Sequence, residues 1–298
     1  MDKKITMKKL ASIAGCSHST VSRALSGSSR ISAETKKRIL ELAARENYRA
    51  QKGQRVAATI WNVADFVPDL YIQLLIQHLA IEMHKRHFRN ISVPYYDIPL
   101  LNELYITGAV SVVPFHRIAR SWSASRPTPL VTVNDYSETV GGIHSVTSDE
   151  YGTVSSVVDM LLASGCRRPV FISPQADNYC HNLRNQSYLD AMHRNGIKPR
   201  IATYCRGFTE GDIVYQDADS FILAGENIVT LKHGLLRRFP TAKLAVWYFQ
   251  EEKHDGEIAV IQNFAELASQ AVSLLECSMN TPADAENRQI PCLIRNFL

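Results

Sequence analysis

Residues 6–27 read TMKKLASIAGCSHSTVSRALSG, and this stretch decides the fold of the N-terminal part of the chain. Thr6 is a typical N-cap residue for a first helix, and Gly15 suits its end because a left-handed backbone conformation costs glycine little. Ser17 can then cap a second helix over residues 18–25. Two helices joined by a tight glycine turn are typical of a helix-turn-helix, whose second helix enters the major groove of DNA.

The second predicted helix has two faces of different chemistry. Its apolar stripe consists of Val21, Ala24 and Leu25. Its opposite stripe is polar, mostly short-chained and able to point outward: His18, Ser19, Ser22, Arg23 and Ser26. Ser32 can cap a third helix that packs behind the first two. A basic three-helix bundle that binds another protein is the alternative to a DNA-binding domain.

Positive charge is concentrated in this N-terminal region. Residues 1–55 carry 13 Lys and Arg against four Asp and Glu, a net charge of +9, whereas the other residues carry 20 against 25, a net charge of −5. A strongly basic head on a mildly acidic body indicates that only the head meets a polyanion. The length of 298 residues suits two or three domains, and the hydrophobic content of 45% is too high for a disordered chain.

Several function classes find little support in the sequence. No stretch approaches the roughly 20 apolar residues of a membrane span, and the N-terminus lacks the apolar core of a signal peptide. The six cysteines are far apart, with no C-x-x-C pair, so we expect reduced thiols in a cytoplasmic protein. Three residue pairs are only weak evidence for a metal or catalytic site: His84/His87, Cys180/His181 and Asp217/Asp219. We therefore expect no enzyme, no catalytic residues, no metal and no cofactor.

Residues 5–48 closely resemble the DNA-binding headpiece of the lactose/galactose repressor (LacI/GalR) family. The resemblance rests on the run TVSRAL at residues 20–25, on S-x-E-T at residues 32–35 and on the closing Asn47-Tyr48. It implies that residues 1–48 form an all-α helix-turn-helix headpiece, which binds double-stranded operator DNA.

Residue roles follow from this resemblance position by position. In the family the second helix reads bases chiefly through its first residues, here His18 and Ser19, followed by Ser22 and Arg23. Arg23 is the strongest candidate, since a guanidinium can bind both acceptors of a guanine edge. Hydroxyl groups hold phosphates, although helix capping is an equally good role for each and can coexist with phosphate binding. The complete set expected at DNA is Thr6, Ser17, His18, Ser19, Thr20, Ser22, Arg23, Ser26, Ser32, Thr35 and Tyr48.

A short linker, residues 49–57, follows the headpiece. In the family a stretch of about ten residues or more folds into a hinge helix on DNA, and paired hinges insert an apolar side chain into the minor groove. This chain offers about eight residues, with Gly53 in the middle and no leucine wedge. We therefore expect no hinge helix and a loosely held headpiece, although a register in which Arg55-Val56-Ala57 begins such a helix stays open.

Residues 58–298 alternate between strand-like and helix-like stretches, which favours parallel sheets with crossover helices. Strands are expected at residues 58–64, 90–93, 109–113, 130–133, 169–173, 220–224 and 244–248. Helices are expected at residues 70–86, 100–107, 149–164, 182–195, 227–239 and 263–277. The predicted fold class is an all-α headpiece plus an α/β domain whose length allows two lobes.

The body resembles the same family more weakly, which implies two lobes like those of periplasmic sugar-binding proteins, a homodimer, and a small-molecule effector such as a sugar. Arg184 falls at the family position that grips sugar hydroxyls, and a forked donor suits vicinal oxygens. Asn134 and Phe249 stand where many members have carboxylates, and the pair that includes Asn227 is altered as well. Two carboxylates thus become an amide and an aromatic ring, which removes acceptors that fix sugar hydroxyls. We therefore expect that the pocket binds a ligand other than the family's usual sugars, or one stacked more on aromatic rings, or that it binds none. Two residues also have structural alternatives to ligand binding: Phe249 could belong to the lobe core, and Arg184 could form an ion pair.

These features predict a sequence-specific DNA-binding transcription regulator, taken as a repressor whose operator binding a small molecule modulates. Two alternatives stay open. A regulator that has lost its effector response would bind DNA constitutively. A soluble sugar-binding protein or sugar-acting enzyme would carry a vestigial headpiece. No membrane partner is expected.

Overall fold

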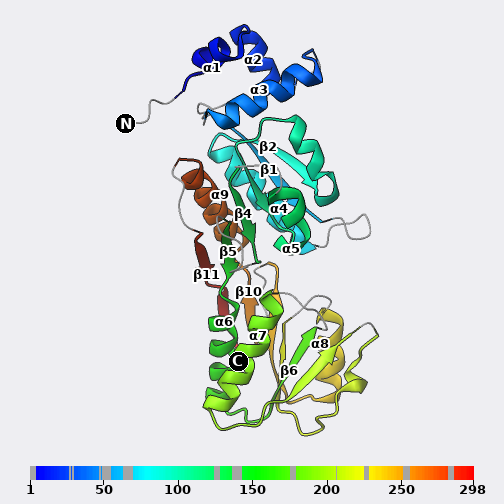
Figure 1. The fold of residues 1–298 in the computed structure, drawn as a ribbon. Helices are drawn as coiled ribbons and strands as arrows, with labels where there is room; N and C mark the ends of the chain where they lie inside the picture. Colours follow the sequence, from blue (N-terminus) through cyan, green and yellow to red (C-terminus); the bar gives the residue numbers. More distant parts are fainter. Residues whose placement is uncertain are drawn as a thin grey trace. The chain divides into compact units, whose positions relative to one another are not determined.

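The chain divides into two units in a computed structural model, and each unit is assembled from separate stretches of sequence (Figure 1). Unit 1 comprises residues 1–146 and 264–288, and unit 2 comprises residues 147–263 and 289–298. The structure describes residues 5–26, 28, 30–46, 48, 55–62, 70–123, 128–135, 143–174, 179–205, 207–224, 228–250, 256–280 and 285–298. Within these residues, none of the helices is long and apolar enough to cross a bilayer.

Unit 1 begins with the three helices of the headpiece: α1 (Met7–Ala14), α2 (His18–Leu25) and α3 (Ala33–Arg45). The predicted caps are present, since Thr6 Oγ1 accepts a hydrogen bond from the Lys9 amide at 3.2 Å. Ser17 Oγ likewise accepts one from the Thr20 amide at 3.1 Å. Gly15 ends α1 with φ at 64°, a left-handed conformation that favours glycine. The helices enclose a buried core: Leu10, Ala11, Val21, Ala24, Leu25, Ile39, Leu42, Ala43 and Tyr48.

The rest of unit 1, called lobe 1 below, is built on a six-stranded sheet with the order β11-β5-β4-β3-β1-β2. Its strands are β1 (Val56–Trp61), β2 (Arg89–Pro94), β3 (Gly108–Ser111), β4 (Leu130–Val133), β5 (His144–Ser148) and β11 (Asn287–Ile290). Strands β1 to β5 pair in parallel, as the predicted crossover connections require. The helices are α4 (Leu70–Lys85), α5 (Phe115–Ser123), α9 (Phe264–Asn280) and the 3-10 helix η1 (Tyr95–Glu103). Helix α9 packs against α4 and against β3 and β4.

Unit 2, called lobe 2 below, contains a second six-stranded sheet with the order β12-β10-β9-β8-β6-β7. Its strands are β6 (Pro169–Pro174), β7 (Ile201–Tyr204), β8 (Ser220–Leu223), β9 (Lys243–Tyr248), β10 (Glu257–Ile261) and β12 (Leu293–Asn296). Only β12, beside β10, pairs antiparallel among the described pairs. The helices are α6 (Glu150–Ala163), α7 (Tyr179–Arg194), α8 (Ile228–Arg238) and the short η2 (Glu210–Asp212). The order reverses between β6 and β8, and ligands typically bind at the carboxyl ends of strands at such a point.

The two parallel sheets confirm the predicted fold class, but the start of lobe 1 needs a correction. Strand β1 begins at Val56, inside the predicted linker 49–57, and ends at Trp61. Val56 and Ala57 therefore belong to a strand, which rules out the register in which they begin a hinge helix. The remainder of the linker, residues 49–54, lies outside the described residues.

The helix expected over residues 100–107 is also wrong. The 3-10 helix η1 lies earlier, includes Pro99 and ends at Glu103, and Leu104 already has extended backbone angles. The sequence pattern does not predict α5, β5, β7, β10 or β11. Strand β5 illustrates the reason: it reads HSVTS, yet all five residues are buried. A strand that buries mostly polar side chains gives no hydrophobic signal.

Candidate nucleic-acid interface

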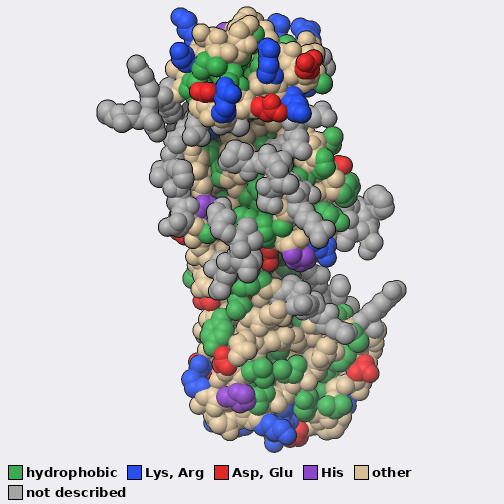
Figure 2. Space-filling view, in the orientation of Figure 1, with side chains coloured by type: hydrophobic (Ala, Val, Ile, Leu, Met, Phe, Trp, Pro, Cys, Tyr) green, Lys and Arg blue, Asp and Glu red, His purple; other side chains and the backbone are tan. Residues whose placement is uncertain are grey.

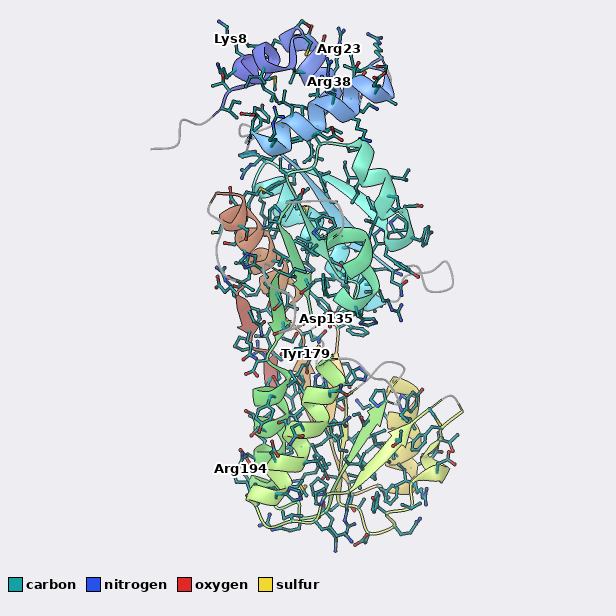
Figure 3. All side chains as sticks on the ribbon, in the orientation of Figure 1. Lys8, Arg23, Arg38, Asp135, Tyr179 and Arg194 are labelled. Atoms are coloured by element: carbon teal, nitrogen blue, oxygen red, sulfur yellow. The ribbon has the colours of Figure 1, made fainter. Side chains whose placement is uncertain are left out.

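Helix α2 presents polar side chains to the outside of the headpiece. His18, Ser19 and Arg23 are exposed and Ser22 is half-buried, whereas the apolar stripe of the helix is buried. Figure 3 shows Arg23 on the headpiece, on the side turned away from lobe 1. A helix with one buried stripe and one outward polar stripe can enter the major groove, which is about 12 Å wide.

Hydroxyl groups cluster at the N-terminus of α2. Ser17 Oγ lies 2.8 Å from both Ser19 Oγ and Thr20 Oγ1. At the start of α3, Ser32 Oγ donates to Thr35 Oγ1 at 2.9 Å and accepts from the Thr35 amide at 3.3 Å. These side chains therefore act as caps. They also lie beside the positive ends of helix dipoles, where a phosphate is favourable.

Basic side chains accompany this polar surface. Figure 2 shows Lys and Arg side chains gathered over the headpiece. The exposed basic residues are Lys8, Lys9, Arg23, Arg30, Lys37, Arg38 and Arg45. Thr6 and Ser26 are exposed as well, and Ser26 Oγ donates to the Arg23 carbonyl at 3.1 Å. The surface thus combines charge for the DNA backbone with hydroxyl donors that can fix the position of a duplex.

Tyr48 differs from the other residues expected at DNA. Only 6% of it is exposed, and it belongs to the headpiece core. Burial raises the pKa of its hydroxyl. Its carbonyl accepts a hydrogen bond from Tyr105 Oη of lobe 1 at 2.6 Å. The structure therefore places Tyr48 inward, whereas the other expected residues are exposed or half-buried.

A buried ion pair occupies lobe 2 among the carboxyl ends of its strands. Arg184 on α7 donates through Nε and Nη2 to the two carboxylate oxygens of Glu150, both at 2.7 Å. Arg184 Nη1 also donates to the Ala224 carbonyl, which follows β8, at 3.2 Å. Glu150 accepts further hydrogen bonds from Trp247 Nε1 at 3.3 Å and Gln262 Nε2 at 2.9 Å. Arg184 thus forms the ion pair that was the alternative to its ligand-binding role.

The electrostatics of this cluster favour a charged pair in neutral surroundings. Burial alone would raise the pKa of Glu150, but the charge and hydrogen bonds of Arg184 outweigh it and lower that pKa. Burial and the Arg184 charge lower the pKa of His181 to about 4, so this imidazole is neutral at pH 7. Burial raises the pKa of the Cys292 thiol to about 12. The pair therefore compensates its own charges inside the lobe.

The other residues expected at a ligand belong to different units. Asn134 of unit 1 follows β4 with φ at 54°, and its Nδ2 donates to Tyr71 Oη at 2.5 Å. Phe249 of unit 2 follows β9 and is half-buried. Asn227 lies outside the described residues.

The sequence did not predict that Glu150 contacts Arg184 and Gln262 in this cluster. Glu150 lies 34 residues before Arg184 and 112 residues before Gln262, so no local spacing reveals their contact. The described residues contain no group of three or more His, Cys, Asp or Glu side chains that could hold a metal ion. The six cysteines form no disulfide bond with one another.

The architecture and the surface of α2 together define a class of protein. A basic helix-turn-helix headpiece precedes two α/β lobes with mostly parallel sheets, a fold that the lac repressor structure shares. Residues 6–51 match the family described as bacterial regulatory proteins, lacI family. The match covers the headpiece region alone, and there it confirms the resemblance to the DNA-binding headpiece of LacI/GalR repressors. No curated protein matches the sequence.

Solved structures of transcription regulators share the fold over most of the chain. The transcriptional regulator CelR in complex with cellobiose has a TM-score of 0.67 at 15% identity, covering 98% of this chain and 99% of that one. The lac repressor dimer bound to operator and the anti-inducer ONPF has a TM-score of 0.67 at 14% identity, covering 99% and 98%. The trehalose repressor from Escherichia coli has a TM-score of 0.66 at 16% identity, covering 81% and 99%. At these identities the likeness establishes the fold.

Proposed function

We propose that the protein is a sequence-specific repressor that binds a DNA operator as a homodimer and responds to a small molecule, with a sugar as the first candidate. The observation that carries this proposal is the outward polar stripe of α2 within a lacI-family headpiece. His18, Ser19 and Arg23 are all exposed there.

Each part of the headpiece has a role in this proposal. Arg23 binds both acceptors of a guanine edge, and His18 and Ser19 add contacts to neighbouring bases. Ser17 and the other capping hydroxyls bind phosphates, which fixes the register of α2 in the groove. In a dimer, two headpieces bind half-sites whose centres lie about 34–36 Å apart, so the operator is pseudo-palindromic.

The effector part of the proposal is supported by the two lobes. CelR, with the same fold, is described in complex with cellobiose, and another neighbour in complex with D-xylulofuranose. A ligand that binds one lobe arrangement more tightly than another shifts the population of the two, and operator affinity shifts with it.

A second candidate, a regulator without effector response, is favoured by the Glu150–Arg184 pair. The carboxylate accepts from Nε and Nη2 of the guanidinium, and the side chains are only 0% and 8% exposed. A sugar that binds Nε and Nη2 of Arg184 must displace the Glu150 carboxylate. Glu150 would then stay buried without its counter-charge, which is costly. Calorimetric titration with a sugar panel separates the candidates. A response to any sugar, with a matching change in operator affinity, supports the first candidate.

The test of the main proposal is selection of duplexes from a random library by the purified full-length protein, repeated with each candidate ligand. We expect enrichment of one pseudo-palindromic site and binding that weakens steeply with salt, because phosphate contacts supply much of the affinity. Equal binding of all duplexes at moderate ionic strength would overturn the proposal. Residues 1–55 fused to a dimeriser test whether the headpiece alone selects the same half-site.

A further inference from the structure

The end of the headpiece contacts lobe 1 through two tyrosines. Tyr105 follows η1, and its hydroxyl donates to the Tyr48 carbonyl at 2.6 Å. The two rings lie 5.9 Å apart between centroids with planes inclined by 52°. Tyr105 also packs against the apolar core of the headpiece, and α3 contacts η1. One side chain of lobe 1 thus contributes both a hydrogen bond and apolar area to the headpiece.

The chain is held a second time where it enters lobe 1. Arg55 Nη1 donates to Glu276 Oε1 of α9 at 2.5 Å, and Nη2 donates to the Arg86 carbonyl at 3.0 Å. Its guanidinium also lies over the Phe88 ring, 4.4 Å from the centroid. Only 11% of the Arg55 side chain is exposed. Six residues, 49–54, separate this anchor from Tyr48.

The hydrogen bond from Tyr105 to the Tyr48 carbonyl does not depend on a group that titrates near physiological pH. A buried tyrosine hydroxyl needs a partner, and a backbone carbonyl is present in every state of the chain. Burial, followed by the neighbouring Tyr48, raises the pKa of Tyr105, so the hydroxyl remains a donor at physiological pH. Glu276, the partner of Arg55, lies on α9, the first element after the chain returns from unit 2.

We propose that the surface of lobe 1 formed by η1 and Tyr105 is a docking site for the chain's own headpiece, with Tyr105 as its positioning residue. The docked headpiece keeps a fixed orientation on lobe 1 in the absence of DNA, in contrast to the loosely held headpiece that the short linker predicts. Docking thereby supplies preorganisation, which lowers the entropy lost when two headpieces bind one operator. This consequence rests on the proposed function, whereas the docking itself does not.

The test compares wild type, Tyr105→Phe and Tyr105→Ala by amide ¹⁵N relaxation of the full-length protein without DNA. We expect wild-type headpiece amides to share the correlation time of lobe 1. In Tyr105→Ala the headpiece should tumble several-fold faster, and Tyr105→Phe, which keeps the ring, should lie between. Tyr215→Phe is the matched control, because Tyr215 also donates to a backbone carbonyl, that of Ile201, within unit 2.

Independent tumbling of the wild-type headpiece, or a Tyr105→Ala protein identical to wild type, overturns the docking proposal. Should Tyr105→Ala fail to fold, Tyr105→Phe and wild type still decide the result. Operator affinity of the same proteins separates this inference from the proposed function. A docked headpiece that selects no operator refutes gene control and leaves docking intact. Operator selection by an independently tumbling headpiece refutes docking alone.

Discussion

The headpiece and the Glu150–Arg184 cluster of lobe 2 are held together in opposite ways. The headpiece caps join residues three apart in sequence: Thr6 with Lys9, Ser17 with Thr20, and Ser32 with Thr35. Glu150 instead bonds partners 34, 97 and 112 residues away. The headpiece also leaves its polar side chains exposed, whereas Glu150 and Arg184 pair their opposite charges inside the lobe. Contacts between neighbouring residues thus shape the exposed surface of the headpiece, whereas contacts between distant residues hold the buried ion pair of lobe 2.

The largest effect is expected from removing one charge of the Glu150–Arg184 ion pair. Glu150→Gln keeps the shape of the side chain but leaves the buried Arg184 charge without its counter-charge. Removing one partner of a buried ion pair costs about 3–5 kcal/mol, so we expect the free energy of unfolding of lobe 2 to fall by that amount. Urea denaturation followed by circular dichroism and by tryptophan fluorescence measures the change.

An exposed pair in the same lobe provides the control. Arg194 lies 3.4 Å from Asp159, with side chains 53% and 55% exposed. Asp159→Asn should change stability by less than about 0.5 kcal/mol, because water screens such pairs. Equal losses in the two variants would contradict the importance of burial.

The pH dependence gives this test a sign. The pKa of Glu150 is lower in the folded state than its ordinary value of 4.5. Its stabilisation is therefore complete above that ordinary value and is lost as pH falls through the folded-state pKa. The stability difference between wild type and Glu150→Gln should accordingly shrink in acid. A difference that stays constant from pH 7 to pH 3 would exclude the ion pair as its cause.

The same contrast explains what the sequence could predict. Gly15 and Ser17 were predictable because a left-handed helix end and a cap each depend on neighbouring residues. The alternation of strands and helices predicted the two parallel sheets, since crossover connections dictate them. Together these local signals were sufficient for the fold class and for the helices of the headpiece.

The features that the sequence did not predict depend on contacts distant in sequence. Glu150 lies in the first turn of α6 like any helix-start carboxylate, and only the fold brings it to Arg184. Tyr105 follows a 3-10 helix that was expected to lie later in the chain, and its partner Tyr48 is 57 residues away. Strand β5 is buried despite its polar composition, so burial there comes from its place in the sheet.

A smaller effect, on operator affinity, is expected from a substitution on the exposed polar stripe of α2. Arg23→Ala should weaken binding to the selected operator by about 1–3 kcal/mol and relax the preference at one base position. Fluorescence anisotropy with the selected site and its single-base variants measures both. Lys8→Ala is the matched control. Lys8 is exposed, and the loss of a lysine that contacts phosphate should weaken binding to all sequences alike and reduce the salt dependence of binding. If Arg23→Ala behaved like Lys8→Ala, the base-reading role of Arg23 would be wrong.

The smallest effect separates the two roles of Ser17, which caps α2 and is also expected to bind phosphate. Ser17→Ala removes the hydrogen bond to the Thr20 amide and should cost about 1 kcal/mol of headpiece stability. Ser17→Asp keeps an acceptor of similar capping strength, so thermal unfolding should leave its stability close to wild type. Its added negative charge repels a phosphate, and operator binding should therefore weaken more in Ser17→Asp than in Ser17→Ala. Unchanged operator binding by Ser17→Asp would assign Ser17 to the fold alone, and the headpiece would then depend on its basic residues for the DNA backbone.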